Sequence, residues 1–456
     1  MTTDAAPGLT LEDLARCFEG AVPAVIATAS ADGTPNITYL SRVQRVDDER
    51  VALSNQFFSK TARNLAENAR ASLLLIDPTT FDQYRLAVVY ERTERRGPVF
   101  ERLRTDVEAL AALEGMQDVF KLRAADIYRV LHVEVMPCRT RPPESARRVT
   151  GGPDPAALAE MATRVSRAAD LDTLVTTTID GLAELFGYEH SMLLLLDEDG
   201  RRLYTIASRG YAAQGVGSEV LVGEGLIGMA AARCAPMRIG NLRQMSNYSR
   251  SLRRSYEGSG DLSPGRDIAV PDLADVQSRV AVPAMAMGQL VGVVVVESTY
   301  PVAFTAADES VLAVVASLVA SAVEAERNDD RAEGEAEDLA LARETRSPEG
   351  TPTRVRFFAV DGSTFLDGDY LIKGVAGRIL WALLGHHERE GRVEFSNREM
   401  RLDPSLELPP FRDNFESRLI LLKRRLDERA APIRIDKTSR GRFRLVVEGR
   451  VELEPV

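Results

Sequence analysis

The chain has 456 residues, of which 45% are hydrophobic and 27% are charged, and its formal net charge is −11. This composition is ordinary for a soluble globular protein, and the length predicts two or three domains that each bury a core. The three cysteines Cys17, Cys138 and Cys234 are scattered without CxxC spacing, which argues against a disulfide framework or a zinc site. The absence of a signal peptide and of a long uninterrupted apolar run predicts a cytoplasmic location with no membrane partner.

Residues 1–140 read as short strands separated by turns. We expect a helix over 9–18, a hairpin turn at Asp32-Gly33, and strands over 24–28, 36–46, 50–53, 71–76, 84–92 and 127–135. The segment SNQFFSKTARNL, residues 54–65, predicts a loop followed by the start of a short helix. A helix N-terminus offers free N–H groups to a phosphate, and a lysine beside it adds positive charge.

The segments PNITYL, VALSN and SKTARNLAENARASL resemble the FMN-binding split barrel of the pyridoxamine 5′-phosphate oxidase-like family. The resemblance implies FMN as a possible cofactor, bound by Ser59, Lys60 and Thr61 with Asn55 beside them, and a homodimer with the flavin in its interface. Thr61 departs from the family pattern, because members often carry a second basic residue there. The alternative is an ordinary helix start with a solvated lysine. No Arg and His set suited to catalysis is evident, so no catalytic residue is assigned. The chain has only four histidines, which argues against a His-rich metal site.

Residues 154–326 form the next predicted domain, after a linker rich in Pro, Arg and Gly. We expect two helices within 158–186, interrupted near Asp170, and strands over 190–196 and 203–208. The run VLVGEGLIG leads through glycines into a helix at 229–233. A strand hairpin follows over 279–299, with its turn at Met287-Gly288-Gln289, and Thr305 and Asp308 begin a long apolar helix.

A hairpin with proline before the turn and GQLVG after it, followed by FTAADE and a long helix, resembles the end of a GAF domain. The resemblance implies a ligand-sensing α/β fold with a small molecule held between its sheet and helices. The ligand is open, and the domain could instead be a dimerisation block. The polar stretch that ends near Val276 is either a lid over the pocket or an insert. We expect Cys234 to be a structural thiol and His190 to be a surface or packed residue, not chromophore or haem ligands.

Residues 327–352 read as a charged linker, and residues 353–456 are the one net basic segment, with 20 Lys and Arg against 17 Asp and Glu. Here we expect strands over 355–360, 433–436 and 442–447, a turn and a short strand within 366–371, and helices over 375–386, 397–402 and 414–429. Residues 437–441 form a basic hairpin between the last two strands.

SRLILLKRRL and IRIDKTSRGRFRL resemble the recognition helix and the wing of the winged-helix output domain of two-component response regulators. In that fold a basic helix enters the major groove and a basic wing contacts phosphates. The resemblance therefore implies DNA contacts by these residues: Arg418, Lys423, Arg424, Arg425, Lys437, Arg440 and Arg442. The alternative is a basic solvated helix in a protein-interaction module.

Together these patterns predict a multidomain chain: a β split barrel, an α/β GAF domain and an α/β winged helix. The function that fits them best is a cytoplasmic sensor-regulator, in which a flavin or small-molecule signal controls DNA binding. The alternative is an FMN-dependent oxidoreductase with regulatory GAF and C-terminal domains. A third hypothesis is a non-enzymatic scaffold. Whether the chain is an enzyme stays open.

Overall fold

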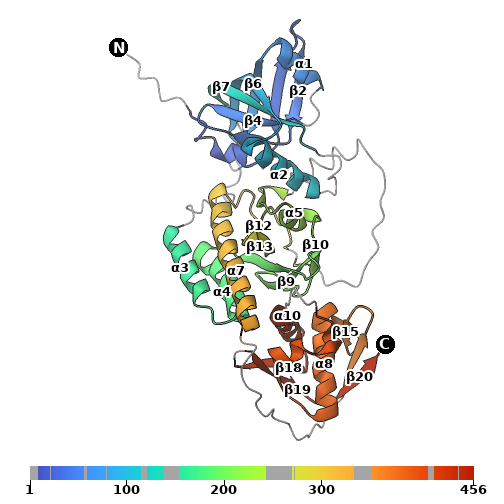
Figure 1. Ribbon diagram of the computed structural model, residues 1–456. Coiled ribbons are helices and arrows are strands. Elements are labelled where there is room, and N and C mark those ends of the chain that lie inside the picture. Colours follow the sequence, from blue (N-terminus) through green and yellow to red (C-terminus); the bar gives the residue numbers. More distant parts are fainter. Residues whose placement is uncertain are drawn as a thin grey trace.

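The computed structural model arranges the chain as three units in a column, with the N-terminal unit at one end, the central unit between and the C-terminal unit at the other (Figure 1). It describes residues 9–20, 22–55, 59–78, 80–113, 121–137, 154–242, 270–271, 273–332, 352–408, 415–439 and 441–456. Most of the polar stretch that ends near Val276, interpreted as a lid or an insert, lies outside the described residues, as do most of the predicted charged linker and Arg440.

The N-terminal unit is built on a seven-stranded antiparallel sheet of order β2-β1-β5-β6-β7-β4-β3. Its elements are η1 (Ala15–Glu19), β1 (Ala24–Ala29), β2 (Pro35–Leu40), β3 (Val43–Arg45), β4 (Arg50–Asn55), α1 (Ser59–Glu67), β5 (Arg70–Ile76), β6 (Gln83–Glu94), α2 (Pro98–Leu113) and β7 (Ala124–Met136). Leu14, Ile26, Leu53, Leu73 and Leu86 are at most 1% exposed and form its core.

Three sequence expectations need correction in this unit. The single strand expected over 36–46 is divided into β2 and β3, because the chain turns inward at Ser41 and Arg42. The backbone N–H of Arg42 donates to Ser54 Oγ at 3.0 Å. The helix expected over 9–18 is a turn followed by η1, which ends at Gly20 with φ of 73°. Helix α2 was not expected at all, although Val99, Leu103 and Val107 recur at helical spacing.

The central unit has a six-stranded antiparallel sheet of order β10-β9-β8-β13-β12-β11. Its elements are α3 (Pro155–Ser166), α4 (Leu171–Phe186), β8 (His190–Leu196), β9 (Arg202–Arg209), β10 (Glu219–Leu221), α5 (Gly225–Arg233), β11 (Met237–Ile239), β12 (Ser278–Ala286), β13 (Gln289–Ser298) and α7 (Ala306–Ala332). The two expected helices, their interruption and the hairpin are all present. Asp170 caps α4 by accepting from the Thr173 N–H at 2.8 Å.

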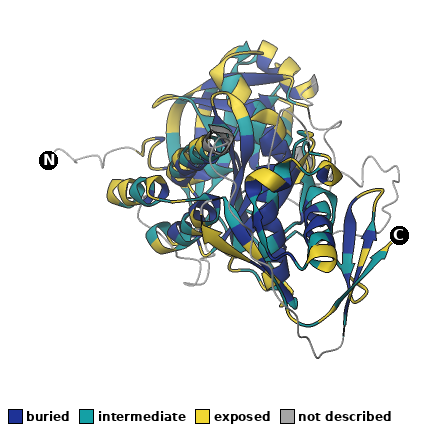
Figure 2. Ribbon diagram, turned by 60° about the horizontal axis from the view of Figure 1, so that its bottom comes forward, coloured by how far each residue is buried: buried dark blue, intermediate teal, exposed yellow. Residues whose placement is uncertain are grey.

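Both faces of the central sheet are buried (Figure 2). Alternate residues of a strand point to opposite faces, so β8 sends Leu193 and Leu195 toward α3, α4 and α7, and sends Met192 and Leu194 toward α5. Val294 and Val293 of β13 divide in the same way. This double burial explains why β8 and β13 read as continuous apolar runs.

The turn of the hairpin and the start of α7 follow the local chemistry expected of them. Met287 and Gly288 have φ of 49° and 78°, the two left-handed residues that a tight hairpin turn requires. Thr305 and Asp308 form a reciprocal cap, since Asp308 Oδ2 accepts from the Thr305 N–H at 2.8 Å and Thr305 Oγ1 accepts from the Asp308 N–H at 3.4 Å.

Helix α7 is long and apolar enough over Ala306–Glu326 to meet the length and composition of a membrane span, contrary to the expectation of no such segment. Leu312, Val315 and Val319 are each 0% exposed and pack with the core on one face of the central sheet. These apolar residues of α7 therefore pack in the core of the central unit.

The C-terminal unit combines a four-stranded sheet of order β16-β15-β14-β20 with a three-stranded sheet of order β17-β19-β18. Its elements are β14 (Thr353–Phe358), β15 (Ser363–Leu366), β16 (Asp369–Ile372), α8 (Gly374–Glu390), β17 (Glu394–Ser396), α9 (Asn397–Arg401), η3 (Pro404–Leu406), α10 (Phe415–Glu428), β18 (Ile433–Ser439), β19 (Arg442–Val447) and β20 (Val451–Pro455). Ser396 caps α9 by accepting from the Glu399 N–H.

Candidate functional site

The first candidate site is the junction between β4 and α1 in the N-terminal unit. Strand β4 ends at Asn55, and α1 begins at Ser59, so Ser59 and Lys60 lie in the first turn of the helix, where backbone N–H groups have no partner within the helix. Lys60 is exposed. An exposed lysine in the first turn of a helix has the chemistry needed to hold a phosphate.

Thr61, the third predicted residue, faces inward and is 3% exposed. Its Oγ1 accepts from Asn36 Nδ2 at 3.0 Å, while Asn64 Nδ2 donates to Thr28 Oγ1 at 3.2 Å. These contacts tie α1 to β1 and β2. The Thr61 hydroxyl therefore helps to fix the position of the helix that carries Lys60.

Asn55 belongs to a buried polar cluster that the sequence analysis did not find. Its Nδ2 donates to Asp126 Oδ2 at 2.9 Å, and Thr93 Oγ1 donates to Asp126 Oδ1 at 2.5 Å. Tyr90 OH lies 2.7 Å from Thr93 Oγ1, and the hydroxyl of the fully buried Tyr128 has no hydrogen-bond partner among the described residues. The only sequence signal was one carboxylate in an otherwise apolar strand, AADIY, because the partners lie far apart in the chain.

Asp126 gives this cluster a predictable pH dependence. Burial raises the pKa of its carboxyl, and the hydrogen bonds from Thr93 and Asn55 offset only part of that effect. A carboxyl whose pKa is raised by folding stabilises the fold fully below its unfolded pKa, and this contribution is lost as the pH rises through the folded pKa. The contribution of Asp126 to the stability of the N-terminal unit should therefore decline as the pH rises above about 4, the ordinary aspartate value.

We expect Asp126→Asn to remove this decline, so that the variant is no less stable than the wild type at pH 7. Hydrogen exchange of β7 peptides between pH 4 and pH 8, corrected for the intrinsic exchange rates, measures it in this unit alone. Asp47→Asn is the control, because hydrogen bonds from Glu49 and Arg50 lower the pKa of the Asp47 carboxyl and its contribution has the opposite sign. Equal slopes for Asp126→Asn and the wild type would contradict the prediction.

The second candidate site is the basic helix α10 with the hairpin β18–β19. Phe415, Leu419, Leu422 and Leu426 are buried in the C-terminal unit, and the opposite side of the helix faces the central unit. Arg418 binds Glu198 with two bonds, Nε to Oε1 at 2.8 Å and Nη2 to Oε2 at 2.5 Å. Its guanidinium carbon lies 3.9 Å from the centroid of the Tyr204 ring, a cation–π distance.

Two further predicted cations of α10 and one of β18 bind carboxylates at the start of α4. Lys423 Nζ lies 2.9 Å from Asp172 Oδ2, and Arg424 Nη2 lies 2.7 Å from Asp172 Oδ1. Lys437 Nζ lies 2.9 Å from Asp170 Oδ2. Burial opposes ionisation of Asp172, but the two cations outweigh it and hold the pKa of that carboxyl below its ordinary value.

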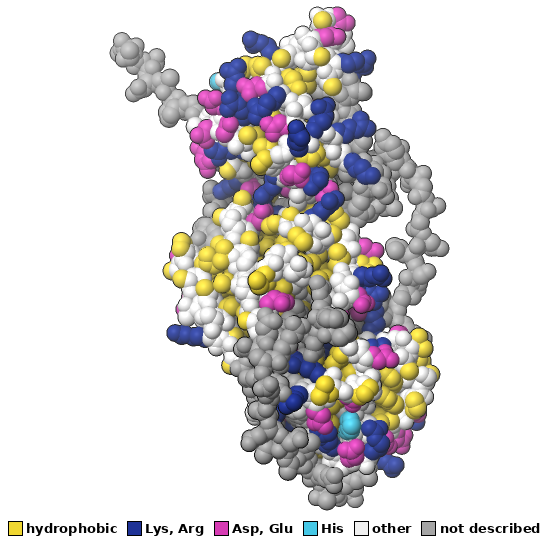
Figure 3. All heavy atoms as spheres, viewed as in Figure 1, with side chains coloured by type: hydrophobic (Ala, Val, Ile, Leu, Met, Phe, Trp, Pro, Cys, Tyr) yellow, Lys and Arg dark blue, Asp and Glu magenta, His cyan; other side chains and the backbone are white. Residues whose placement is uncertain are grey.

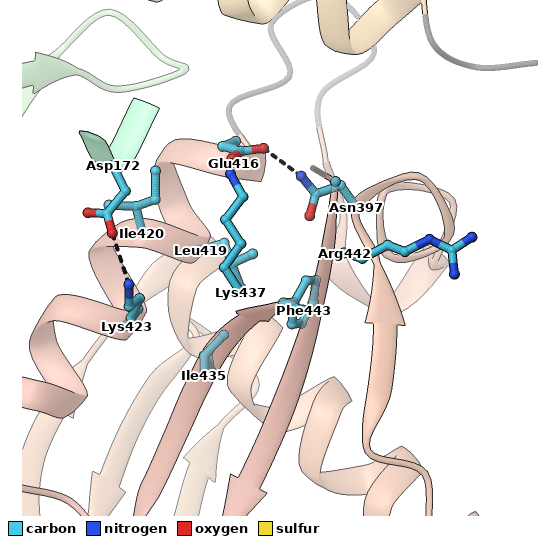
Figure 4. Close-up of a pocket in the computed structure, with 11 residues that line it drawn as sticks. Asp172, Asn397, Glu416, Leu419, Ile420, Lys423, Ile435, Lys437, Arg442 and Phe443 are labelled. Carbon is cyan, nitrogen blue, oxygen red and sulfur yellow. Dashed lines mark hydrogen bonds and ion pairs between the residues drawn. The ribbon is translucent and has the colours of Figure 1, made fainter. Parts of the chain in front are cut away.

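The remaining predicted residues lie elsewhere. Arg425 is buried and serves its own unit, since Nε donates to the Leu371 carbonyl at 3.0 Å and Nη1 binds Glu428 at 2.7 Å. Arg442 begins β19, and in Figure 4 its side chain extends away from Asp172. The structure thus brings Arg418, Lys423, Arg424 and Lys437 together on one surface, which we call the basic face. Arg425 lies outside this face, and Arg442 lines a small cavity beside it.

A small cavity lies within this contact (Figure 4). Its floor is formed by Leu419, Ile435 and Phe443, and its rim by charged and amide groups, among them Asp172, Lys423 and Lys437. Asn397 donates to Glu416 across one side. Among the described residues no group of three His, Cys, Asp or Glu side chains could hold a metal ion.

Comparison with known families assigns two of the three units. Residues 168–324 match the GAF domain family, and residues 11–131 match the pyridoxamine 5′-phosphate oxidase family. The central unit is a GAF domain. The N-terminal unit is a β half-barrel of the pyridoxamine 5′-phosphate oxidase type. No curated protein matches the chain.

Solved structures resemble single domains of the chain. The GAF domain of an Acinetobacter phosphoenolpyruvate-protein phosphotransferase is 21% identical with a TM-score of 0.31, and covers 38% of this chain and 93% of its own. An FMN-binding protein from Syntrophomonas wolfei subsp. wolfei is 16% identical with a TM-score of 0.23, and the match covers 28% of this chain and 93% of that protein. Free methionine-R-sulfoxide reductase from Neisseria meningitidis, in complex with its substrate, is 20% identical with a TM-score of 0.30. The match covers 38% of this chain and 89% of that protein.

The residues singled out as possible GAF ligands have ordinary surroundings. Cys234 is exposed and ends α5 with φ of 48°. The His190 ring is half-buried at the start of β8 and packs edge-on against Tyr211, with 5.8 Å between the ring centroids.

The half-barrel contacts the GAF domain through α2 and η1, a contact that sequence reasoning missed. Arg238 of β11 binds Glu19 of the half-barrel and, through Nε, binds Glu309 of α7 at 3.1 Å. Arg102 of α2 reaches the same Glu309 at 3.1 Å. Ala109 of α2 is 1% exposed and packs in the core on the α5 side of the GAF sheet. Charged side chains of both signs also mix over the outer surface of the half-barrel (Figure 3).

Proposed function

We propose that the chain is a sensor-regulator, in which the half-barrel and the GAF domain receive a flavin or small-molecule signal and control DNA binding by the C-terminal unit. The observation that carries the proposal is the order of the C-terminal elements: three helices, α8, α9 and α10, followed by the β18–β19 hairpin, with cations on the third helix and on the hairpin. This is the order of a winged helix, in which the third helix reads the major groove and the wing contacts phosphates.

Exposed apolar side chains on β2 support a homodimeric arrangement of the half-barrel. Ile37 and Tyr39 of β2 are 70% and 65% exposed on a strand at the edge of the sheet. Exposed apolar side chains on an edge strand favour contact with another protein surface. In our proposal this contact is with a second copy of the chain.

Salt-dependent binding to duplex DNA tests the DNA-binding half of the proposal. We expect the full chain to bind a labelled mixed-sequence duplex in fluorescence anisotropy at low salt, with an affinity that falls steeply as salt rises. The Lys423→Ala/Arg424→Ala variant should weaken binding and reduce the salt slope by about one for each phosphate that is no longer neutralised. Arg354→Ala/Arg356→Ala, which removes two exposed cations from β14, is the matched control.

The flavin half of the proposal rests on the first turn of α1. We expect Lys60→Ala to weaken FMN binding by about 10- to 100-fold, because a hydrogen bond to a charged group contributes about 1.5–3 kcal/mol. Quenching of flavin fluorescence in a titration of the apoprotein measures the affinity.

Two controls make this test specific for the phosphate. Lys60→Arg should retain most of the FMN affinity, and riboflavin, which lacks the phosphate, should bind the wild type and Lys60→Ala equally. If the wild type binds no FMN, the half-barrel has no flavin role. If bound flavin is bleached by NAD(P)H and reoxidised with steady turnover, the result favours the oxidoreductase alternative over the sensor-regulator.

A further inference from the structure

Four of the cations proposed to contact DNA are already bound within the chain, by carboxylates of the GAF domain. Arg418 is bound by Glu198, Lys423 and Arg424 by Asp172, and Lys437 by Asp170. The two elements that would meet DNA, the third helix and the hairpin, are therefore both occupied. We call Asp170, Asp172 and Glu198 the acidic face of the GAF domain.

The contact covers the two arginines of the basic face and leaves its lysines partly exposed, Lys423 at 32% and Lys437 at 35%. The side chains of Arg418 and Glu198 are each 12% exposed, Arg424 is 19% exposed and Leu421 is 3% exposed. Tyr204 OH donates to Ser417 Oγ at 3.0 Å, so the β9 strand lies directly on the helix. A duplex whose major groove received α10 would occupy the same space as β9 and the start of α4.

The contact combines charged and hydroxyl groups with the edge of an apolar core that the two units share. Most of the specific bonds across it are ion pairs, several of them partly solvated, together with the Tyr204 hydroxyl and the Gly215 N–H, which donates to Glu428 at 3.1 Å. Contacts between domains of one chain are commonly of this polar kind, whereas permanent interfaces are more apolar. The acidic face presents carboxylates to the same cations that phosphates would contact.

We propose that the acidic face of the GAF domain is the intramolecular partner of the basic face and competes with DNA for it. This inference rests on the proposed DNA-binding function. The chain then has a docked state, in which α10 is covered, and an undocked state that binds a polyanion. The apparent affinity for DNA is reduced by the fraction of molecules that are docked.

The test removes charge from the acidic face and leaves the basic face intact. The variant Asp172→Asn/Glu198→Gln loses the carboxylates that bind Arg418, Lys423 and Arg424. Asp170 is left in place because it caps α4. The control variant is Asp180→Asn/Glu184→Gln, which makes the same change in net charge. Both residues lie in α4, where Asp180 binds Arg209 and Glu184 binds Arg164.

We expect the Asp172→Asn/Glu198→Gln variant of the full chain to bind a labelled mixed-sequence duplex at least about tenfold more tightly than the wild type, if docked molecules outnumber undocked ones by about ten to one. The control should change binding much less. Independently of DNA, hydrogen exchange of α10 peptides should be faster in the variant than in the wild type and the control.

The outcomes separate the inference from the function on which it rests. If the wild type binds the duplex as tightly as the variant, or the control gains as much as the variant, the competition is wrong and DNA binding stands. If neither protein binds any duplex at low salt while α10 exchange increases in the variant, the DNA-binding function is wrong, and the competition with it.

Discussion

Replacing Arg238 by alanine is expected to destabilise the chain by about 3 kcal/mol, because the substitution leaves the partly buried Glu19 without the cation that binds it and leaves Glu309 with Arg102 alone. The Arg238 side chain is 7% exposed, and its partners Glu19 and Glu309 are 14% and 11% exposed. Its Nη1 also donates to the Phe304 carbonyl at 3.2 Å. One residue thus joins the half-barrel, the β11 edge of the GAF sheet and the start of α7.

Urea unfolding followed by circular dichroism measures the loss, and hydrogen exchange of α2 peptides shows whether the half-barrel separates from the GAF domain. Arg209→Ala is the control, since Arg209 and Asp180 are 43% and 42% exposed and an exposed pair contributes less than about 1 kcal/mol. Adding Glu19→Gln and Glu309→Gln to the Arg238 variant should restore part of the stability. Equal losses for the Arg238 and Arg209 variants would contradict the prediction.

Gly377→Ala is expected to destabilise the C-terminal unit by about 2–3 kcal/mol, although alanine is the better helix former by about 1 kcal/mol. A Cβ at Gly377 would lie 2.0 Å from the Gly362 carbonyl oxygen and 2.8 Å from Thr364 Oγ1. Both atoms belong to the β15 region against which α8 packs, so relief requires the helix to move away from its sheet.

Gly385→Ala makes the same substitution on the same helix and is expected to be neutral or stabilising. Its new Cβ would meet only the Arg389 guanidinium, at 3.0 Å, and that side chain can move. Trp381, the only tryptophan of the chain, lies on α8 and reports unfolding of this unit by fluorescence. A Gly377→Ala variant as stable as Gly385→Ala would show that α8 is not held as closely as the structure has it.

Local chemistry made much of the fold predictable from the sequence. The hairpin turn at Gly288, the Thr305–Asp308 cap and the helix break at Asp170 all depend on residues within a few positions of each other, and all are present. The family matches confirm the half-barrel and the GAF domain. The winged helix, the flavin site and the DNA contacts stay predictions.

What sequence reasoning could not supply is the pairing of distant charges. Composition and capping predicted a basic helix, but Arg418 and Glu198 are 220 positions apart, and Lys437 and Asp170 are 267 apart. No periodicity indicates which carboxylate such a cation meets. The Asn55–Asp126 cluster was missed for the same reason, whereas α2 carried a helical pattern that could have been found.

The arrangement of β9 has a consequence for how a signal travels through the GAF domain. Leu203 packs in the core beneath α5, and the next residue, Tyr204, lies on the opposite face of the sheet, where its ring stacks on Arg418. A single peptide plane therefore connects the half-barrel side of the domain to the helix that would read DNA. A shift of the β9 backbone at this point would alter the packing on both faces of the sheet at once, at Leu203 and at the Tyr204–Arg418 contact.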